Sequence, residues 1–213
     1  MDRSENTLQR RSLAAFLSLM QRHDTWSGRL VLLSASDEAA AFAMAVLATG
    51  GAVLWVCADE TSLRESGLQG LSDFQVTTLG EALRILKNEI RKGLPVSVAV
   101  LDAAGTVWGE AAARGVQPDA VWPGDKDAEA GGVLIERGAE RLVVADADGI
   151  LARTAQTWRE LRAIDAELLE QLSGCALAER MAGERWLRAA SRLFPGEMHR
   201  CYAAAWTASK DSR

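Results

Sequence analysis

Two aspartates, Asp146 and Asp148, have the spacing of a catalytic pair. They follow the apolar run 142–145, which we interpret as a buried strand. Two carboxylates at positions i and i+2 beyond a strand can act as nucleophile and general acid, with Mg²⁺ between them and a phosphate ester. The alternative is a strand that leaves the sheet through a polar turn. A motif needs its structural context, and we expect no strand after residue 150, so the sequence favours the turn.

Other side chains that could bind a metal are sparse. Asp125, Asp127 and Glu129 could suggest a cation loop, but a calcium loop needs more oxygen ligands and a distal bidentate Glu. Acidic residues are also favoured at the start of a helix. His199 and Cys201 form an isolated His-x-Cys, whereas zinc takes four ligands. The sequence therefore predicts no metal site.

The composition is that of an ordinary globular protein. The chain has 213 residues, of which 48% are hydrophobic and 25% charged, so it can bury a core. Its net charge is -5 and its basic residues are dispersed, whereas nucleic-acid binding needs a concentrated basic surface. The first 12 residues contain no apolar signal segment, and no apolar run approaches the roughly 20 residues that span a bilayer. Three separated cysteines are typical of a reducing compartment, so we expect a cytoplasmic protein that binds neither nucleic acid nor membrane.

The elements that must position a site alternate between short apolar strands and amphipathic helices. Strands are expected at residues 29–33, 52–56, 74–77, 96–101, 120–122 and 141–145. Helices are expected at residues 7–23, 37–48, 62–68, 79–92, 106–114 and 128–137. Ser34 or Ser36 can cap the second helix, and in the first helix Gln9, Arg10, Arg11 and Gln21 are available for the solvent-facing side. This alternation predicts an α/β fold, a Rossmann-like three-layer sandwich with a mostly parallel sheet.

The last quarter of the chain has a different pattern. Residues 150–205 contain no strand signal, and their apolar stripes predict two helices that Gly174 separates. The chain shows no low-complexity linker and no internal repeat. We therefore expect one domain over residues 1–213, with a Rossmann-like core at 28–146, an N-terminal helix, and C-terminal helices packed on the core.

Five short motifs occur in a fixed order in the middle of the chain. They are Gly28-Arg-Leu-Val, Gly50-Gly51, Leu79-Gly-Glu-Ala-Leu83, Gly93-Leu-Pro-Val-Ser-Val-Ala-Val-Leu101 and Arg114-Gly-Val-Gln-Pro-Asp119. In this order and spacing they resemble the NAD-binding domain of urocanase (urocanate hydratase). The resemblance implies a Rossmann-like domain that binds NAD and uses it as an electrophile to hydrate urocanate. The family's larger core region, with its catalytic cysteine, has no counterpart in this sequence.

The residues that the resemblance assigns to the cofactor are mostly replaced. The family's Gly-rich phosphate turn corresponds to residues 34–38, Ser-Ala-Ser-Asp-Glu, which contain no glycine. Asp37 and Glu38 place carboxylates where a pyrophosphate would bind to a helix N-terminus. Cys57 stands in place of the acidic residue that holds the ribose, and Asp59 matches the family but is not that ligand.

The remaining cofactor segments also differ. The family's Gly-Asn-Ala corresponds to Asp102-Ala103-Ala104, and its Gln-Thr-Ser-Ala-His corresponds to residues 124–128. Trp55 and Trp122 end strands near the carboxyl edge of the sheet, where they either pack in the core or line a ligand pocket. The candidate pocket residues are Ser34, Ser36, Cys57, Asp59, Asp102, Ala104 and Trp122, with Trp55 beside them.

These replacements favour a binding module over an enzyme. We expect no cofactor, no catalytic residue, and an unknown small molecule or protein as partner. Two alternatives are NAD binding through backbone contacts, and a Mg²⁺-dependent phosphatase, because Asp146 and Asp148 also resemble the first motif of haloacid-dehalogenase-type phosphatases. Trp158 and Trp186 belong either to internal packing or to a homodimer surface.

Overall fold

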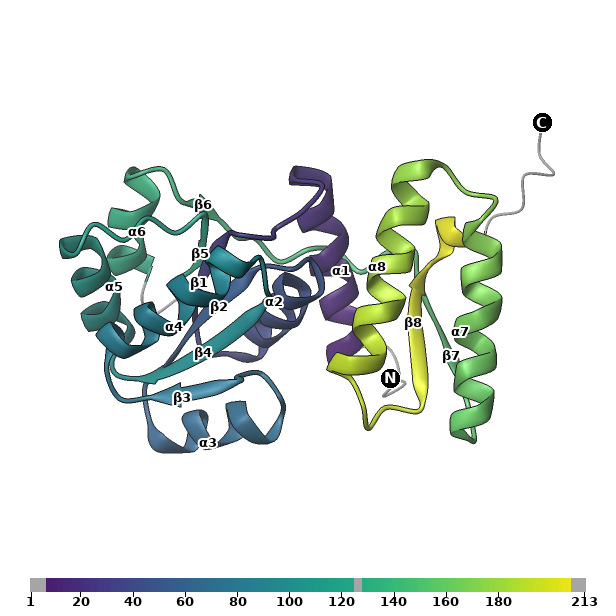
Figure 1. Cartoon of the computed structure of the whole chain (residues 1–213), viewed down its shortest axis with the longest axis horizontal. Coiled ribbons are helices and arrows are strands. Elements are labelled where there is room, and N and C mark those ends of the chain that lie inside the picture. The colour runs from purple at the N-terminus through teal and green to yellow at the C-terminus, as the bar shows by residue number, and fades with distance from the viewer. Residues whose placement is uncertain (1–6, 125–127, 208–213) are drawn as a thin grey trace.

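A computed structural model describes residues 7–124 and 128–207. Within them, six strands form one parallel sheet with helices on both faces (Figure 1). The strands are β1 (Leu30–Ser34), β2 (Ala52–Cys57), β3 (Phe74–Val76), β4 (Val96–Leu101), β5 (Ala120–Trp122) and β6 (Glu140–Arg141). The accompanying helices are α1 (Leu8–Arg22), α2 (Asp37–Ala48), α3 (Glu60–Leu68), α4 (Leu79–Lys92), α5 (Ala104–Ala113) and α6 (Ala128–Glu136). The predicted Rossmann-like α/β fold is confirmed.

The strand order is β3-β4-β2-β1-β5-β6. From β1 the chain winds outward through β2 to β4, with β3 added at the edge, and then crosses back to place β5 on the other side of β1. Leu33 of β1 pairs with Trp55 of β2 and with Trp122 of β5, so these strands end at the same edge. The winding direction changes between β1 and β5, which is where open α/β sheets bind ligands.

Both faces of the sheet are buried because the central strands are apolar throughout. Every side chain of β1 and of β2 is buried, as expected for parallel strands that helices cover on both sides. On one face, Val31 and Leu33 of β1 pack in a cluster with α1 and α2. On the other face, Leu30 and Leu32 pack in a cluster with α4 and α5.

Several helices begin where the sequence supplies a capping side chain. Ser36 Oγ accepts a hydrogen bond from Ala39 N at 3.1 Å and so caps α2, whereas Ser34 lies inside β1. Thr7, Asp59 and Thr78 cap α1, α3 and α4 in the same way. Each cap satisfies one of the N–H groups that a helix start leaves without a partner. None of the helices in residues 7–124 and 128–207 combines the length and the apolar character needed to cross a membrane.

Strand β6 is much shorter than the strand expected at residues 141–145, and that prediction is wrong beyond the first residue. The last ladder hydrogen bond runs from Leu142 N to Val121 O at 2.9 Å. The partner strand β5 then ends before Pro123, which has no N–H to donate. Val143 and Val144 follow Leu142 and are each 60% exposed, so the apolar run continues past the end of the sheet.

The segment after β6 forms a smaller unit of two strands and two helices. β7 (Ile150–Thr154) and β8 (His199–Ala203) form an antiparallel pair, with α7 (Trp158–Leu172) and α8 (Leu177–Leu193) between them in the chain (Figure 1). The two helices agree with the prediction, but the expectation that no strand follows residue 150 is wrong. Of the five side chains of β7 only Ile150 is buried, so no apolar alternation marks this strand in the sequence.

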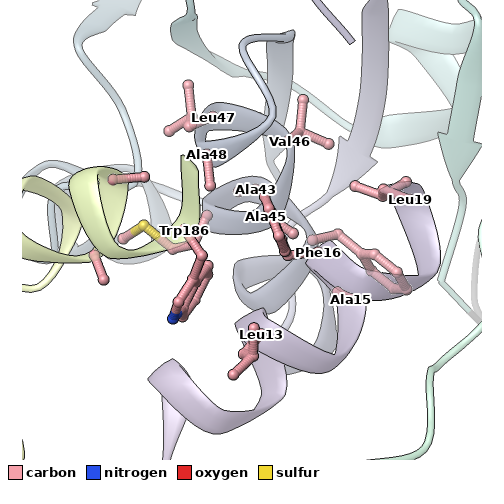
Figure 2. Close-up of a cluster of buried hydrophobic side chains, with 14 of the residues drawn as sticks. Leu13, Ala15, Phe16, Leu19, Ala43, Ala45, Val46, Leu47, Ala48 and Trp186 are labelled. Carbon is pink, nitrogen blue, oxygen red and sulfur yellow. The ribbon is translucent and has the colours of Figure 1, made fainter. Parts of the chain in front are cut away.

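Helix α1 lies between the parallel sheet and this smaller unit (Figure 1). Figure 2 shows the apolar side chains of α1, among them Leu13 and Phe16, beside the alanine-rich helix α2 and Trp186 of α8. The rings of Phe16 and Trp186 lie 5.4 Å apart between centroids. One continuous hydrophobic cluster therefore joins α1, α2, α8 and β8.

Gln9 of α1 is fully buried at this contact, so its predicted solvent-facing position is wrong. Its Oε1 accepts from Cys201 N at 2.6 Å, and its Nε2 donates to Glu197 Oε2 at 2.7 Å. The indole of Trp186 donates to Cys201 O at 2.9 Å. Gln9 and Trp186 thus bind both backbone groups of Cys201, which satisfies them inside the core.

Candidate functional site

The candidate site lies at the carboxyl edge of the sheet, where the winding direction changes between β1 and β5. The structure places Ser34 at the end of β1, Ser36 at the cap of α2, and Trp122 at the end of β5, where it pairs with Leu33. The other candidates follow along the same edge in strand order, with Cys57 at the end of β2 and Asp102 after β4. The predicted residues therefore share one edge, as the parallel sheet requires.

The turn from β1 to α2 contains only non-glycine residues, and none of them has a positive φ angle. Ser36 uses its hydroxyl to cap the helix, which occupies the Ala39 amide. Asp37 and Glu38 form the first turn of α2 and are exposed. Their carboxylates lie at the positive end of the helix dipole, which stabilises them there. The turn therefore already supplies negative charge to its own helix N-terminus.

Arg11 lies beside this turn, although the sequence analysis assigned it to solvent. Its Nη1 donates to Asp37 O at 3.1 Å, and its Nε is buried and has no acceptor among the described residues. Only the docking of α1 on α2 brings Arg11 to this place, and no local pattern in the sequence signals it. Arg11 adds one positive charge next to two carboxylates.

Cys57 is fully buried, on the sheet face that α1 and α2 cover. Burial raises the pKa of the Cys57 thiol to about 11, and the neighbouring Trp55 indole and Ser66 hydroxyl offset this shift only in part. The side chain is thus a protonated thiol inside the core at neutral pH.

Asp59, Asp102 and Ala104 take part in local structure. Asp59 Oδ1 accepts from Ser62 N at 2.8 Å as the cap of α3, and hydrogen bonds from Ser62 hold the pKa of Asp59 below its usual value. Asp102 Oδ1 accepts from Ala103 N at 2.6 Å. Ala104 is buried as the first residue of α5. The two aspartates are exposed and each already has a backbone partner.

Two buried polar atoms next to the change in winding direction have no partner among the described residues. Ser34 is 7% exposed, and its Oγ has no hydrogen bond. Trp122 packs its ring on Phe42 of α2, with 5.1 Å between ring centroids, and its Nε1 also has no acceptor. A ligand at this edge could use either of these atoms, and the indole N–H of Trp55, which also has no acceptor among the described residues.

The cavity at this edge is small and takes in few of the candidates. It measures about 110 Å³ and lies between the β1–α2 turn and α3, where Ser36 and Trp55 line it. Cys57, Asp102 and Trp122 are not among its lining residues. Pockets for small ligands usually hold roughly 300–1,000 Å³, so this cavity falls below that range.

The first half of the chain matches a known protein family. The model of the urocanase Rossmann-like domain matches residues 11–123, just over half of the chain. This chain belongs to the urocanase Rossmann-like domain family. The match begins in α1 and ends after β5, so it reaches further upstream than the motifs that begin at Gly28.

The part of the chain beyond the urocanase Rossmann-like domain holds the second candidate site. Asp146 and Asp148 lie in an irregular segment, five and seven residues after β6 ends at Arg141. Asp146 Oδ1 accepts from Asp148 N at 3.1 Å in an exposed polar turn. The strands that follow belong to a separate antiparallel pair, so the pair of aspartates does not lie at the end of a strand of the parallel sheet.

The sequence predicts no metal site, because it offers few side chains that could act as metal ligands. Asp125 and Asp127 lie outside the described residues, and Glu129 is exposed in the first turn of α6. Cys201 is buried, and burial raises its pKa to about 11. Within residues 7–124 and 128–207, no three or more His, Cys, Asp and Glu side chains come together as metal ligands.

Proposed function

We propose that this urocanase Rossmann-like domain is a non-catalytic binding module whose dinucleotide site is degenerate. It would act by binding a small ligand or a protein partner, without a cofactor. The observation that carries the proposal is the β1–α2 turn, where Asp37 and Glu38 stand exposed in the first helical turn. In a dinucleotide-binding domain the same place receives the pyrophosphate.

Simple electrostatics supports the loss of NAD binding at this turn. Two unit charges of the same sign about 6 Å apart repel each other by about 1–3 kcal/mol at effective dielectric constants between 80 and 20. A helix N-terminus offers about 0.3–1 kcal/mol to an exposed anion, and Asp37 and Glu38 already use it. Repulsion between the two carboxylates and a pyrophosphate therefore outweighs the attraction of the helix.

The surroundings of the turn support the same proposal. The side chain at the ribose position, Cys57, is buried, and the neighbouring cavity holds only about 110 Å³. A binding role without catalysis also agrees with Asp59 and Asp102, because their carboxylates accept hydrogen bonds from nearby backbone N–H groups. Buried cysteine thiols such as Cys57 and Cys201 are typical of a reducing compartment, and we propose a cytoplasmic location.

A second candidate function, residual NAD binding, is favoured by three polar groups. The Ser34 hydroxyl and the indole N–H of Trp122 have no partner among the described residues, and Arg11 carries a positive charge next to α2. These groups could offset the lost contacts if the turn moved. The two candidates differ in the affinity that they predict for NAD⁺ and NADH.

Isothermal titration of the purified chain with NAD⁺ and with NADH separates the two candidates. We expect no binding tighter than about 100 μM, which corresponds to roughly 5.5 kcal/mol. The double substitution Asp37→Asn with Glu38→Gln should strengthen binding about tenfold or more if repulsion is the cause. Glu60→Gln, in the exposed first turn of α3, removes a charge elsewhere and is the matched control. Wild-type binding tighter than about 100 μM would overturn the proposal.

Internal packing and a homodimer surface are the two alternatives for Trp158 and Trp186, and the two side chains differ in their burial. Trp186 is fully buried against Phe16 and Phe194, and this supports internal packing. Trp158 is 50% exposed at the start of α7. We therefore propose a homodimer through the face of α7 around Trp158, which sedimentation analysis tests: a Trp158→Ala variant should be monomeric where the wild-type chain is a dimer.

A further inference from the structure

A second hollow lies at the opposite, amino-terminal edge of the sheet. It measures about 540 Å³ and lies between α8 and the loops that precede β1, β2 and β4. Arg185, Arg188 and Arg192 line it from α8, opposite Gly50 and Gly93. Positions i, i+3 and i+7 share one face of a helix, so α8 turns these three of its arginines into one hollow. We call this hollow the arginine groove.

Two of the three guanidinium groups have little to bind within the protein. Arg185 is anchored, because its Nη1 donates to Asp24 O at 2.8 Å. Arg188 has an 81% exposed side chain and lies 3.8 Å from Glu184, too far for a strong pair. Arg192 makes no ion pair or side-chain hydrogen bond with any residue that the structure describes. The groove thus combines one fixed arginine with two that remain available.

The charge of the arginine groove is opposite to that of the whole chain. The chain carries a net charge of -5, whereas the lining of the groove contains three arginines against the single carboxylate of Glu184. The carboxyl ends of α2 and α4 also border the groove, and each contributes about half a negative charge. The balance remains positive by about one charge, which favours an anion.

The shape of the groove suits a small molecule. A neighbouring hollow of about 300 Å³ shares Leu47, Pro95 and Arg192 with it, so Arg192 lies where the two meet. Volumes of this size fall in the range of small-ligand sites, roughly 300–1,000 Å³. The planar guanidinium group presents paired N–H donors that match the oxygens of a phosphate or a carboxylate.

We infer that the arginine groove binds a small organic anion that carries phosphate or carboxylate groups, with Arg188 and Arg192 as its main contacts. The inference rests on the proposed function, because it gives the chemical class of ligand for a chain that acts by binding. It places this ligand at the edge of the sheet opposite to the dinucleotide turn. The turn and the groove can therefore be tested separately.

Titration with pyrophosphate and with citrate, at constant ionic strength, tests the inference. At least one anion should bind with a Kd of about 1 mM or tighter, and the stronger of the two identifies the phosphate or the carboxylate source. The double substitution Arg188→Ala with Arg192→Ala should weaken this binding about tenfold or more. Arg180→Ala is the matched control, because Arg180 is exposed on the same helix outside the groove.

Two further measurements show whether the arginine side chains themselves bind the anion. Both substituted arginines are exposed, so circular dichroism of the double alanine variant should show an unchanged fold. A double Arg→Lys variant should bind more weakly than wild type, since lysine keeps the charge but not the paired donors. Binding of neither anion with a Kd of about 1 mM or tighter, or equal binding by wild type and the double alanine variant, would refute the inference. NAD⁺ binding tighter than about 100 μM that survives the double alanine substitution would instead overturn the proposed function alone.

Discussion

Replacing Gln9 with leucine should destabilise the whole chain, because this side chain joins the first helix to the last strand. Leucine is close to glutamine in size, so the substitution removes hydrogen bonds while it leaves little empty space. Three partners would be affected. Cys201 N would lose its acceptor, and the carboxylate of Glu197 and the carbonyl of His199 would lose a donor.

The magnitude follows from the burial of these groups. A buried N–H without a partner costs about 1–3 kcal/mol, and a hydrogen bond to a charged group contributes about 1.5–3 kcal/mol. The free energy of unfolding should therefore fall by about 3–6 kcal/mol, which corresponds to a midpoint lower by roughly 6–24 °C in a chain of this length. Burial already raises the pKa of Glu197, while His199 and the Gln9 donor act against the shift, so this pKa should rise further in the variant.

Urea unfolding followed by tryptophan fluorescence measures the effect, because Trp186 is buried beside the substituted contact. Gln21→Leu is the matched control, since Gln21 is exposed on the same helix and should change stability by about 0.5 kcal/mol or less. A loss below about 1 kcal/mol for Gln9→Leu would show that the buried amide does not hold the two parts together.

Two other predictions concern the candidate site and the buried thiols. Ser36→Ala removes the cap of α2 and should lower the free energy of unfolding by about 1 kcal/mol, measured by urea unfolding, and an unchanged midpoint would count against the cap. Burial raises the pKa of Cys57 and of Cys201 from 9.0 to about 11, so the unfolded chain loses these protons first and stability should fall as the pH rises from 9.0 to about 11. The double variant Cys57→Ala with Cys201→Ala should lack most of this fall in unfolding experiments across that pH range, and an equal fall in both proteins would contradict the assignment.

The parallel sheet could be predicted because its strands are short apolar runs that helices cover on both faces. Residues 96–101, for example, form β4 as expected, since every position but the last is buried. The prediction of a strand at residues 141–145 was wrong because the residues of one segment do not determine how far its partner strand extends. Its length depends on its partner β5, which ends before Pro123.

The smaller unit was harder to predict because its strands are mostly exposed. Leu151 fits an apolar helical stripe in the sequence, yet it lies in β7 with its side chain 43% exposed. Gln9 was assigned to solvent because an amide is polar, and only the backbone of β8, which lies 192 residues further along the chain, explains its burial. Local periodicity carries no information about such distant partners.

The candidate site also has one part that the sequence predicts and other parts that it does not. The turn at residues 34–38 could be located from the strand before it and the helix after it, and the structure has both at those places. Arg11 reaches the turn only because α1 packs on α2, and the arginine groove exists only because α8 lies near loops more than 80 residues earlier in the chain. Sites that a single β–α connection builds are visible in sequence, whereas sites between distant elements are not.

The position of α1 has a consequence for the synthesis of the protein on the ribosome. Helix α1 is made before the other described elements, whereas the strand that binds Gln9 comes from residues 199–203, near the end of the described chain. At usual rates of about 5–20 residues per second, roughly 10–40 s pass before that strand leaves the ribosome. During this interval α1 can pack on α2, while the side of α1 that later meets Trp186 and β8 stays open to chaperones.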